Sequence, residues 1–182
     1  MKFVNRILVL AVALALVTEF SYAQKFPGLD PSPADIAYFR EGNQRNGAPV
    51  VKVVYGRPQK KGRKMLGEAE PFGKVWRLGA NETTEIKLYR DVTFGDKKIS
   101  AGTYSMYAIP NADKWTIIFN SKLDTWGAYA YDESKDVARI EVPATKSDKE
   151  FEAFTIDFNG TADSGNMFFA WENTMVTVPF KY

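Results

Sequence analysis

The succession of short apolar runs is the feature that most restricts what this chain can fold into. From Pro49 onward, β-branched and aromatic residues form about ten runs at a spacing of roughly 8–12 residues, with turn residues between them. Residues 83–89, for example, place Thr84, Ile86 and Leu88 on one face and charged residues on the other. The pattern predicts an all-β, single-domain fold over residues 49–182, an antiparallel β-sandwich that is jelly-roll-like or barrel-like.

The N-terminus has the three parts of an export signal. Lys2 and Arg6 precede an apolar run over residues 7–17, and the Ser-Tyr-Ala sequence ending at Ala23 favours cleavage before Gln24. The apolar run is shorter than the roughly 20 residues that cross a bilayer, although a retained anchor helix is the alternative. We therefore expect a signal peptide over residues 1–23, a periplasmic or extracellular protein, and no transmembrane segment after cleavage.

Residues 24–48 differ in composition from the predicted strands. They are rich in Pro, Gly and Asn, and Ser32 followed by Pro33 has the pattern of a helix N-cap and first turn. We expect a leader with one short N-terminal helix whose contacts are made by Ile36, Tyr38 and Phe39. The formal net charge of +2 gives no indication of a nucleic-acid partner, and the oligomeric state stays open.

The chain contains neither Cys nor His. This excludes Ser-His-Asp and Cys-His catalytic sites, disulfides, and zinc sites built from His or Cys. Any catalysis would depend on carboxylates, Lys or Tyr, and any metal would need oxygen ligands. We expect no metal and no cofactor.

Glycine, arginine and tryptophan are concentrated in residues 55–84. The window contains Tyr-Gly-Arg-Pro at 55–58, Lys-Gly-Arg at 61–63 and Gly-Lys-Val-Trp-Arg-Leu-Gly-Ala-Asn-Glu-Thr-Thr at 73–84. With these motifs, and with Ala-Gly-Thr-Tyr-Ser at 101–105 and Ala-Trp-Glu at 170–172, the chain resembles the bacterial family known as domain of unknown function 2911. The resemblance implies a compact β-rich domain typical of secreted and periplasmic proteins of Bacteroidetes-type bacteria. It implies no activity, substrate or catalytic residue.

The same window supplies candidate binding residues. The guanidinium forks of Arg57, Arg63 and Arg77, with Asn81 and Glu82, are suited to a carboxylate, phosphate or sulfate group. The alternative is a buried network in which Arg77 pairs with Glu82 and holds an irregular loop over residues 56–82.

Aromatic residues offer a second hypothesis. In an exported β-sandwich, exposed Trp126 and Tyr131 would stack on sugar rings, whereas the alternative places such rings in the core. A carboxylate-based hydrolase using Glu82 or Glu172 is a further candidate function. We therefore expect a binding module for a glycan or an anionic small molecule, with a hydrolase or a structural envelope protein without a small-molecule ligand as alternatives.

Export gives the first testable expectation. Because the signal has all three parts, N-terminal sequencing of the protein from the envelope fraction should give Gln24 as the first residue. A chain that still begins at Met1 and sediments with membranes would contradict the export prediction.

Overall fold

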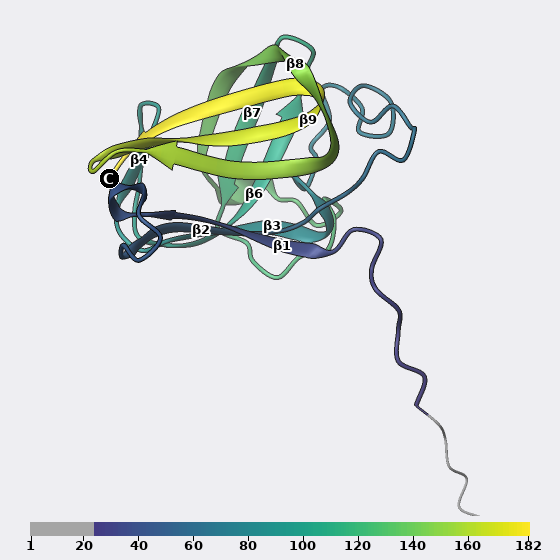
Figure 1. Ribbon diagram of the computed structural model, residues 1–182, viewed down its shortest axis with the longest axis horizontal. Coiled ribbons are helices and arrows are strands. Elements are labelled where there is room, and N and C mark those ends of the chain that lie inside the picture. The colour runs from purple at the N-terminus through teal and green to yellow at the C-terminus, as the bar shows by residue number, and fades with distance from the viewer. Residues whose placement is uncertain (1–23) are drawn as a thin grey trace, which may run out of the picture.

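The computed structural model describes residues 24–182 (Figure 1). The predicted signal peptide, residues 1–23, lies outside the described residues. The described chain contains strands and two short 3-10 turns but no α-helix: β1 (Ala34–Arg40), η1 (Glu41–Asn43), β2 (Pro49–Gly56), β3 (Ala80–Leu88), β4 (Val92–Phe94), β5 (Lys97–Ile99), β6 (Gly102–Pro110), β7 (Lys114–Asn120), η2 (Glu133–Lys135), β8 (Asp136–Gly160) and β9 (Ser164–Lys181).

All nine strands belong to one hydrogen-bonded sheet in the order β1-β2-β3-β6-β7-β8-β9-β4-β5. Every pairing is antiparallel. The prediction of an all-β antiparallel fold is confirmed, while its division into the two layers of a sandwich stays a prediction.

The long strand β8 carries the sheet from one side of the molecule to the other. Residues 136–143 pair with β7, and the pairing changes at Pro143, beyond which Ala144 and the following residues pair with β9. Proline suits this position because it lacks the N–H that a continuous ladder requires. Figure 1 shows the result: β9 and the second half of β8 lie opposite β1, β2 and β3, with β6 and β7 between the two sides.

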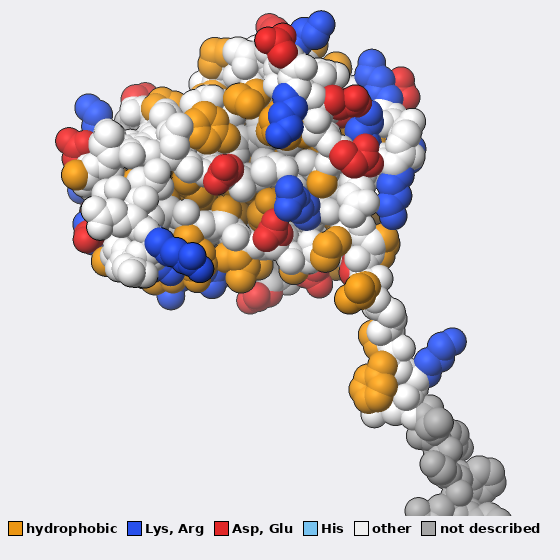
Figure 2. All heavy atoms as spheres, viewed as in Figure 1, with side chains coloured by type: hydrophobic (Ala, Val, Ile, Leu, Met, Phe, Trp, Pro, Cys, Tyr) orange, Lys and Arg blue, Asp and Glu red, His pale blue; other side chains and the backbone are white. Residues whose placement is uncertain are grey.

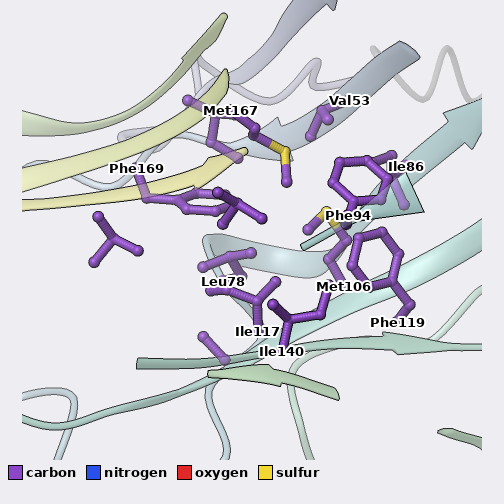
Figure 3. Packing of buried hydrophobic residues seen from close by; sticks show 14 of the residues in the cluster. Val53, Leu78, Ile86, Phe94, Met106, Ile117, Phe119, Ile140, Met167 and Phe169 are labelled. Carbon is purple, nitrogen blue, oxygen red and sulfur yellow. The ribbon is translucent and has the colours of Figure 1, made fainter. Parts of the chain in front are cut away.

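The core lies between these opposed parts of the sheet. Figure 3 shows side chains from many strands converging on one interior, among them Val53, Ile86, Met106, Ile117 and Phe169. Thr84, Ile86 and Leu88 are buried, as the alternation in residues 83–89 predicts.

The predicted N-terminal helix is wrong. Residues 34–40 form β1, which pairs with β2 from Ala34 opposite Gly56 to Arg40 opposite Pro49. The Asp30 carboxylate accepts a hydrogen bond from the Ser32 backbone N–H at 2.6 Å, which gives a local turn instead of a helix cap. Pairing with the valine-rich β2 therefore decides the structure here, although the capping pattern is present.

Two other local predictions also differ from the structure. Residues 129–131 are one of the short runs that predict strands, but Tyr129 and Ala130 lie in a turn and Tyr131 follows it. The four runs at residues 137–142, 151–158, 166–171 and 175–180 predict four strands, but they are the halves of only two, β8 and β9. The β8–β9 pairing shifts register near Phe151 and Thr155, so the breaks between these runs are irregularities within long strands and not chain reversals.

Residues 24–30 extend away from the folded part (Figure 1), and Phe26 and Leu29 are exposed there. Over the globular part, Figure 2 shows charges of both signs interspersed with apolar side chains. Within residues 24–182, no helix is long and apolar enough to cross a membrane.

The corrected N-terminal strand leads to a stability prediction. Phe39 is fully buried and lies 5.0 Å from the Phe180 ring, whereas its neighbour Tyr38 points outward with 41% of its surface exposed. Phe39→Ala should therefore lower the free energy of unfolding by about 3–5 kcal/mol, and Tyr38→Ala by less than about 1 kcal/mol. Thermal unfolding of both variants measures the difference. Equal losses in the two variants would contradict the alternating burial of β1.

Candidate functional site

The loop over residues 57–79 leaves and rejoins the sheet at one point. Gly56 pairs with Ala80, and a Cβ on Gly56 would lie 2.1 Å from the Ala80 carbonyl oxygen, so only glycine allows this approach. Trp76 extends the sheet by bridging to Ala108 of β6. The two ends of the loop are thus held together, directly beside Asn81 and Glu82.

Arg57 binds groups of the fold itself. Its Nη1 lies 3.0 Å from Asp35 Oδ2, its Nε donates to the Phe154 carbonyl at 3.1 Å, and its Nη2 donates to Thr155 Oγ1 at 2.9 Å. These contacts join β1, the loop and β8. The guanidinium fork is therefore used in the structure and is not directed at the groove described below.

Arg63 holds its own turn. Its Nε donates to the Lys60 carbonyl at 3.0 Å, and its Nη2 donates to the Gln59 carbonyl at 2.9 Å. The predicted set of three arginines around Asn81 and Glu82 is not present, because Arg57 and Arg63 each satisfy other groups.

Arg77 is not paired with Glu82. No ion pair joins them in the described chain, and Glu82 is exposed. Arg77 lies near Glu70 instead, and its Nε is buried without a hydrogen-bond partner. Burial raises the pKa of Glu70 to about 7, although the positive charge of Arg77 acts to lower it. The Arg77–Glu82 pair, the alternative to a binding site, is therefore not formed among residues 24–182, and the acid whose pKa Arg77 affects is Glu70 of the same loop.

Glu172, one of the two carboxylates proposed for a hydrolase, also holds the loop. Its Oε1 accepts from the Met65 N–H at 2.8 Å and its Oε2 from the Leu66 N–H at 3.1 Å. Its backbone has a φ of 53°, which aims the side chain from β9 at these amides. Both carboxylate oxygens are therefore occupied by backbone donors.

Asn81 and Glu82 line a groove of about 310 Å³ at the end of the outer face of β1, β2, β3 and β6. Asn81 adopts a φ of 62°, in the left-handed region that asparagine tolerates. The remaining lining is polar and acidic on a small apolar base: Ser32, Ala34, Val54, Tyr55, Gly56, Thr83, Glu85, Ser105, Asp124 and Thr125. With the carboxylates of Glu82, Glu85 and Asp124, the groove offers mainly hydrogen-bond acceptors.

Trp126 lies beside this groove. It forms a β-bridge with Glu82, in which the Thr83 N–H donates to the Thr125 carbonyl and the Gly127 N–H to the Asn81 carbonyl, each at 2.9 Å. Residues opposite each other in such a bridge have side chains on the same face. The Trp126 side chain therefore borders the Glu82 side of the groove.

Trp126 and Tyr129 form a stacked pair that is open to solvent. Their ring centroids are 5.9 Å apart with an interplanar angle of 8°, and 60% of Trp126 and 87% of Tyr129 are exposed. Gly127 makes the stack possible, because it has a φ of 67° and a Cβ there would lie 2.8 Å from the Tyr129 ring. The parallel, exposed rings form what we call the aromatic platform, Trp126 and Tyr129.

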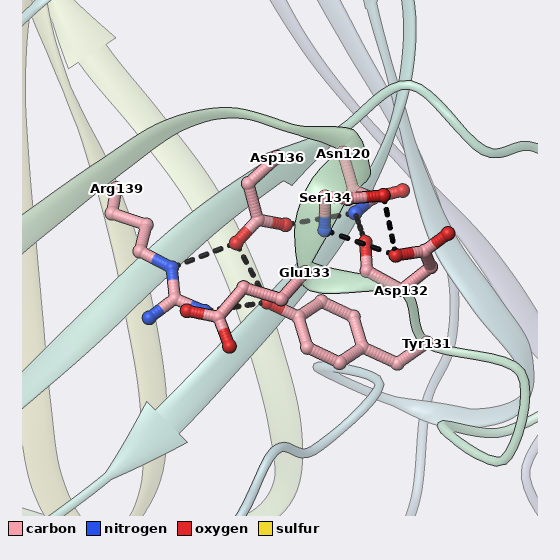
Figure 4. A network of polar contacts seen from close by, with 7 residues as sticks. All are labelled: Asn120, Tyr131, Asp132, Glu133, Ser134, Asp136 and Arg139. Carbon is pink, nitrogen blue, oxygen red and sulfur yellow. Dashed lines mark hydrogen bonds and ion pairs between the residues drawn. The ribbon is translucent and has the colours of Figure 1, made fainter.

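Tyr131 does not belong to the aromatic platform but to a polar network with residues of β7 and β8 (Figure 4). Its hydroxyl donates to Asp136 Oδ2 at 2.6 Å and accepts from Arg139 Nη2 at 2.7 Å. Arg139 Nε also contacts Asp136 Oδ2 at 2.7 Å, and Asn120 donates to Asp136 Oδ1 at 2.8 Å. Tyr131 is thus held in this network, and the ring that stacks with Trp126 is that of Tyr129.

The protonation states of Tyr131 and Arg139 favour the hydrogen bonds that they form with Asp136. Burial and the hydrogen bond to Asp136 raise the pKa of Tyr131 to about 12, so the phenol stays protonated and can donate. The hydrogen bond to Asp136 raises the pKa of Arg139 as well. Tyr131 therefore stays a neutral donor and Arg139 a cation across the physiological pH range.

A second, larger cavity of about 670 Å³ lies at the turn between β8 and β9 and is lined by Asn43, Asn159, Ser164 and other largely uncharged residues. It contains none of the predicted site residues and no exposed aromatic ring. Over residues 24–182, no group of three or more acidic side chains is arranged to hold a metal ion. The groove beside the aromatic platform is therefore the candidate functional site.

From residues 126–131, sequence analysis selected Trp126 and Tyr131 as stacking residues instead of Tyr129, and it did not select Glu85 or Asp124. The Trp-Gly-Ala-Tyr sequence at 126–129 is a signal for Tyr129, because a glycine with positive φ permits ring stacking across a turn. Asp124 enters the groove through a loop with a φ of 56°, which no sequence pattern indicates.

The comparisons with known proteins identify a family but no activity. A family model described as "Protein of unknown function (DUF2911)" matches residues 39–180, a range that contains the groove residues from Val54 onward and the aromatic platform. No curated protein matches the chain, and no solved structure matches it.

The raised pKa of Glu70 predicts a pH-dependent stability. The folded state binds the Glu70 proton more tightly than the unfolded state, whose carboxyl has the ordinary value of 4.5. The contribution to stability is thus highest below about pH 4.5 and falls as pH rises toward about 7. Glu70→Gln removes this loss. It should raise the free energy of unfolding by about 1–2 kcal/mol at pH 8 and leave it unchanged at pH 4.5.

Thermal melts at pH 4.5, 6 and 8 measure the effect. Glu68→Gln, at an exposed carboxylate two residues away, is the matched control and should show no such dependence. A Glu70→Gln difference that is the same at all three pH values would contradict the buried, protonated state of Glu70.

Proposed function

The chain belongs to the family described as "Protein of unknown function (DUF2911)"; since that description assigns no activity, we propose from the geometry of the site that the protein binds a glycan in the groove beside the aromatic platform. The observation that carries the proposal is the stacked pair of Trp126 and Tyr129, exposed next to a lining of hydroxyl, amide and carboxylate groups. Large aromatic side chains that are exposed next to each other on the surface are typical of interaction sites.

The chemistry of a sugar matches both parts of the site. A pyranose ring has an apolar C–H face that packs on an aromatic ring, and a rim of hydroxyl groups that donate hydrogen bonds. The carboxylates of Glu82, Glu85 and Asp124 accept such bonds, and Asn81 both donates and accepts. The groove volume of about 310 Å³ is within the range of small-ligand sites.

Binding without hydrolysis is the function favoured by the carboxylates. Glu172 is fully engaged by the amides of Met65 and Leu66, which leaves Glu82 as the other carboxylate of the hydrolase hypothesis. A glycosidase needs two carboxyl groups with separated pKa values on either side of the bond that is cleaved. We therefore propose a binding module, and hydrolysis is the second candidate because Glu82 and Glu85 both line the groove.

We further propose that the protein acts outside the cytoplasm, in the periplasm or extracellularly. The signal sequence ending at Ala23 supports this location, and the absence of cysteine is compatible with an oxidising compartment. The scaffold would be sandwich-like, because Phe39 of β1 packs on Phe180 of β9 across the core.

The test is a binding assay with a panel of cello-, malto-, xylo- and chito-oligosaccharides. Binding is measured by Trp fluorescence and by calorimetry. Trp126→Ala should weaken binding by about tenfold or more, because an aromatic anchor contributes on the order of 1–2 kcal/mol or more. Gly127→Ala keeps both rings but breaks their stack, so it should weaken binding as well. Phe72→Ala, at a similarly exposed aromatic side chain away from the groove, should have no effect.

The same oligosaccharides also test the hydrolase alternative. Release of new reducing ends that stops in Glu82→Gln would establish hydrolysis in place of simple binding. If the wild-type protein bound no oligosaccharide of any charge, or if Trp126→Ala bound as tightly as wild type, the proposed function would be wrong.

A further inference from the structure

The outer face of the sheet continues beyond the groove in a regular register. Side chains at alternate positions share one face, and paired residues extend each row across the strands. The row that contributes to the groove runs from β1 to β6 through Ile36, Val54, Glu85 and Ser105. The next row, two residues further along each strand, consists of Tyr38, Lys52, Lys87 and Thr103.

Lys52 and Lys87 are directly opposite each other in this second row. Cβ atoms of opposed residues in an antiparallel pair are about 4.5–5.5 Å apart, and like charges in this arrangement are destabilising. Lys52 is half-buried, which reduces the solvent screening between the two ammonium groups. Two lysines are therefore opposed across β2 and β3, and the Lys87 ammonium lies over the Tyr89 ring, 5.0 Å from its centroid.

No carboxylate neutralises this pair. Other lysines on the strands form ion pairs with acids close to them: Lys114 pairs with Glu141, and Lys98 pairs with Asp91. Among the ion pairs of residues 24–182, none involves Lys52 or Lys87. Glu85, the nearest acid in the register, lies in the neighbouring row that faces the groove.

The two rows thus divide one face into an acidic part and a basic part. Glu82, Glu85 and Asp124 at the groove repel an anion, while Lys52 and Lys87 attract one. Same-face residues two apart on a strand are separated by about 6.5–7 Å. This spacing is comparable to the length of one pyranose unit, so a chain held in the groove would present its next unit to the lysines.

We infer that Lys52 and Lys87 form an anion subsite next to the groove, and that the ligand of the site is a polysaccharide in which charged units follow neutral ones. A neutral unit would lie in the acidic groove, and the carboxylate or sulfate group of the next unit would lie on these lysines. This inference rests on the proposed function, which it deepens by naming the class of glycan. Thr103 at the end of the row adds a hydroxyl donor for an anionic oxygen. The bound anion would also offset the repulsion between the two ammonium groups.

The experiment compares neutral and acidic oligosaccharides of equal length, such as chito-oligosaccharides against hyaluronan oligosaccharides, in which carboxylate-bearing units alternate with neutral ones. The wild-type protein should bind the acidic ligands more tightly, with an affinity that falls as salt is raised. Lys52→Gln and Lys87→Gln should each weaken acidic binding by about fivefold, and the double variant by about tenfold or more. Binding of neutral oligosaccharides should not change.

Lys146→Gln is the matched control, because Lys146 is exposed on β8 and makes no ion pair among residues 24–182. It removes the same charge and should not alter affinity for any ligand. Thermal melts provide a readout that needs no ligand: Lys87→Gln should leave the melting temperature unchanged or raise it, since it removes a repulsive partner.

The outcomes separate this inference from the proposed function. Neutral and acidic ligands bound equally, with both sensitive to Trp126→Ala, would overturn the anion subsite and leave the glycan site intact. An equal loss of acidic binding in Lys146→Gln would also overturn it, because the effect would then be one of net charge. Binding to phosphatidylglycerol vesicles that requires Lys52 and Lys87, without acidic oligosaccharide binding, would assign the lysines to a lipid surface instead.

Discussion

The stacking of Trp76 on Trp171 is the contact on which the rest of the structure depends. The two rings lie 5.5 Å apart at 15°, and Phe154 packs against both. Since the chain has no cysteine, apolar burial and hydrogen bonds such as those of Glu172 must hold the 23-residue excursion from Arg57 to Gly79. Trp76 fixes this excursion to β8 and β9, and its Nε1 donates to the Gly79 carbonyl at 3.0 Å. The end of the loop, and therefore the start of β3, is positioned by the core.

The aromatic platform is held in a different way, because it faces water. If Trp126 and Tyr129 were buried to fix their loop, their rings would no longer be accessible from the surface. The loop is fixed instead by polar contacts on its inner side, where Tyr131 and Asn120 meet the Asp136 carboxylate, of which only 10% is exposed. Charge-assisted bonds of this kind are strong when partly buried, so they can position an exposed pair of rings.

The sequence predicts those features that depend on neighbouring residues. Alternation identified the inner face of β3, and the composition of residues 55–84 and 126–131 identified Asn81, Glu82 and Trp126, which the structure places together. It did not predict the partners of Arg57, which are 22 and 97 residues away in sequence. The error at β1 has the same origin, because the capping pattern at Ser32 is local whereas pairing with β2 is not. Local sequence patterns do not indicate which residue, distant in sequence, a side chain such as that of Arg57 will bind.

This difference explains why the motif rich in arginine is not itself the anion site. A guanidinium fork satisfies two or three acceptors at once, and in a loop crowded with carbonyl groups those acceptors are nearest in the backbone. Arg57 and Arg63 accordingly bind carbonyls of Phe154, Gln59 and Lys60. The strands at Lys52 and Lys87 use their carbonyl groups in the ladder, and Lys87 lies over the Tyr89 ring instead. Neither lysine forms an ion pair among residues 24–182, and the proposed anion subsite therefore lies on the regular face of the sheet, next to the groove.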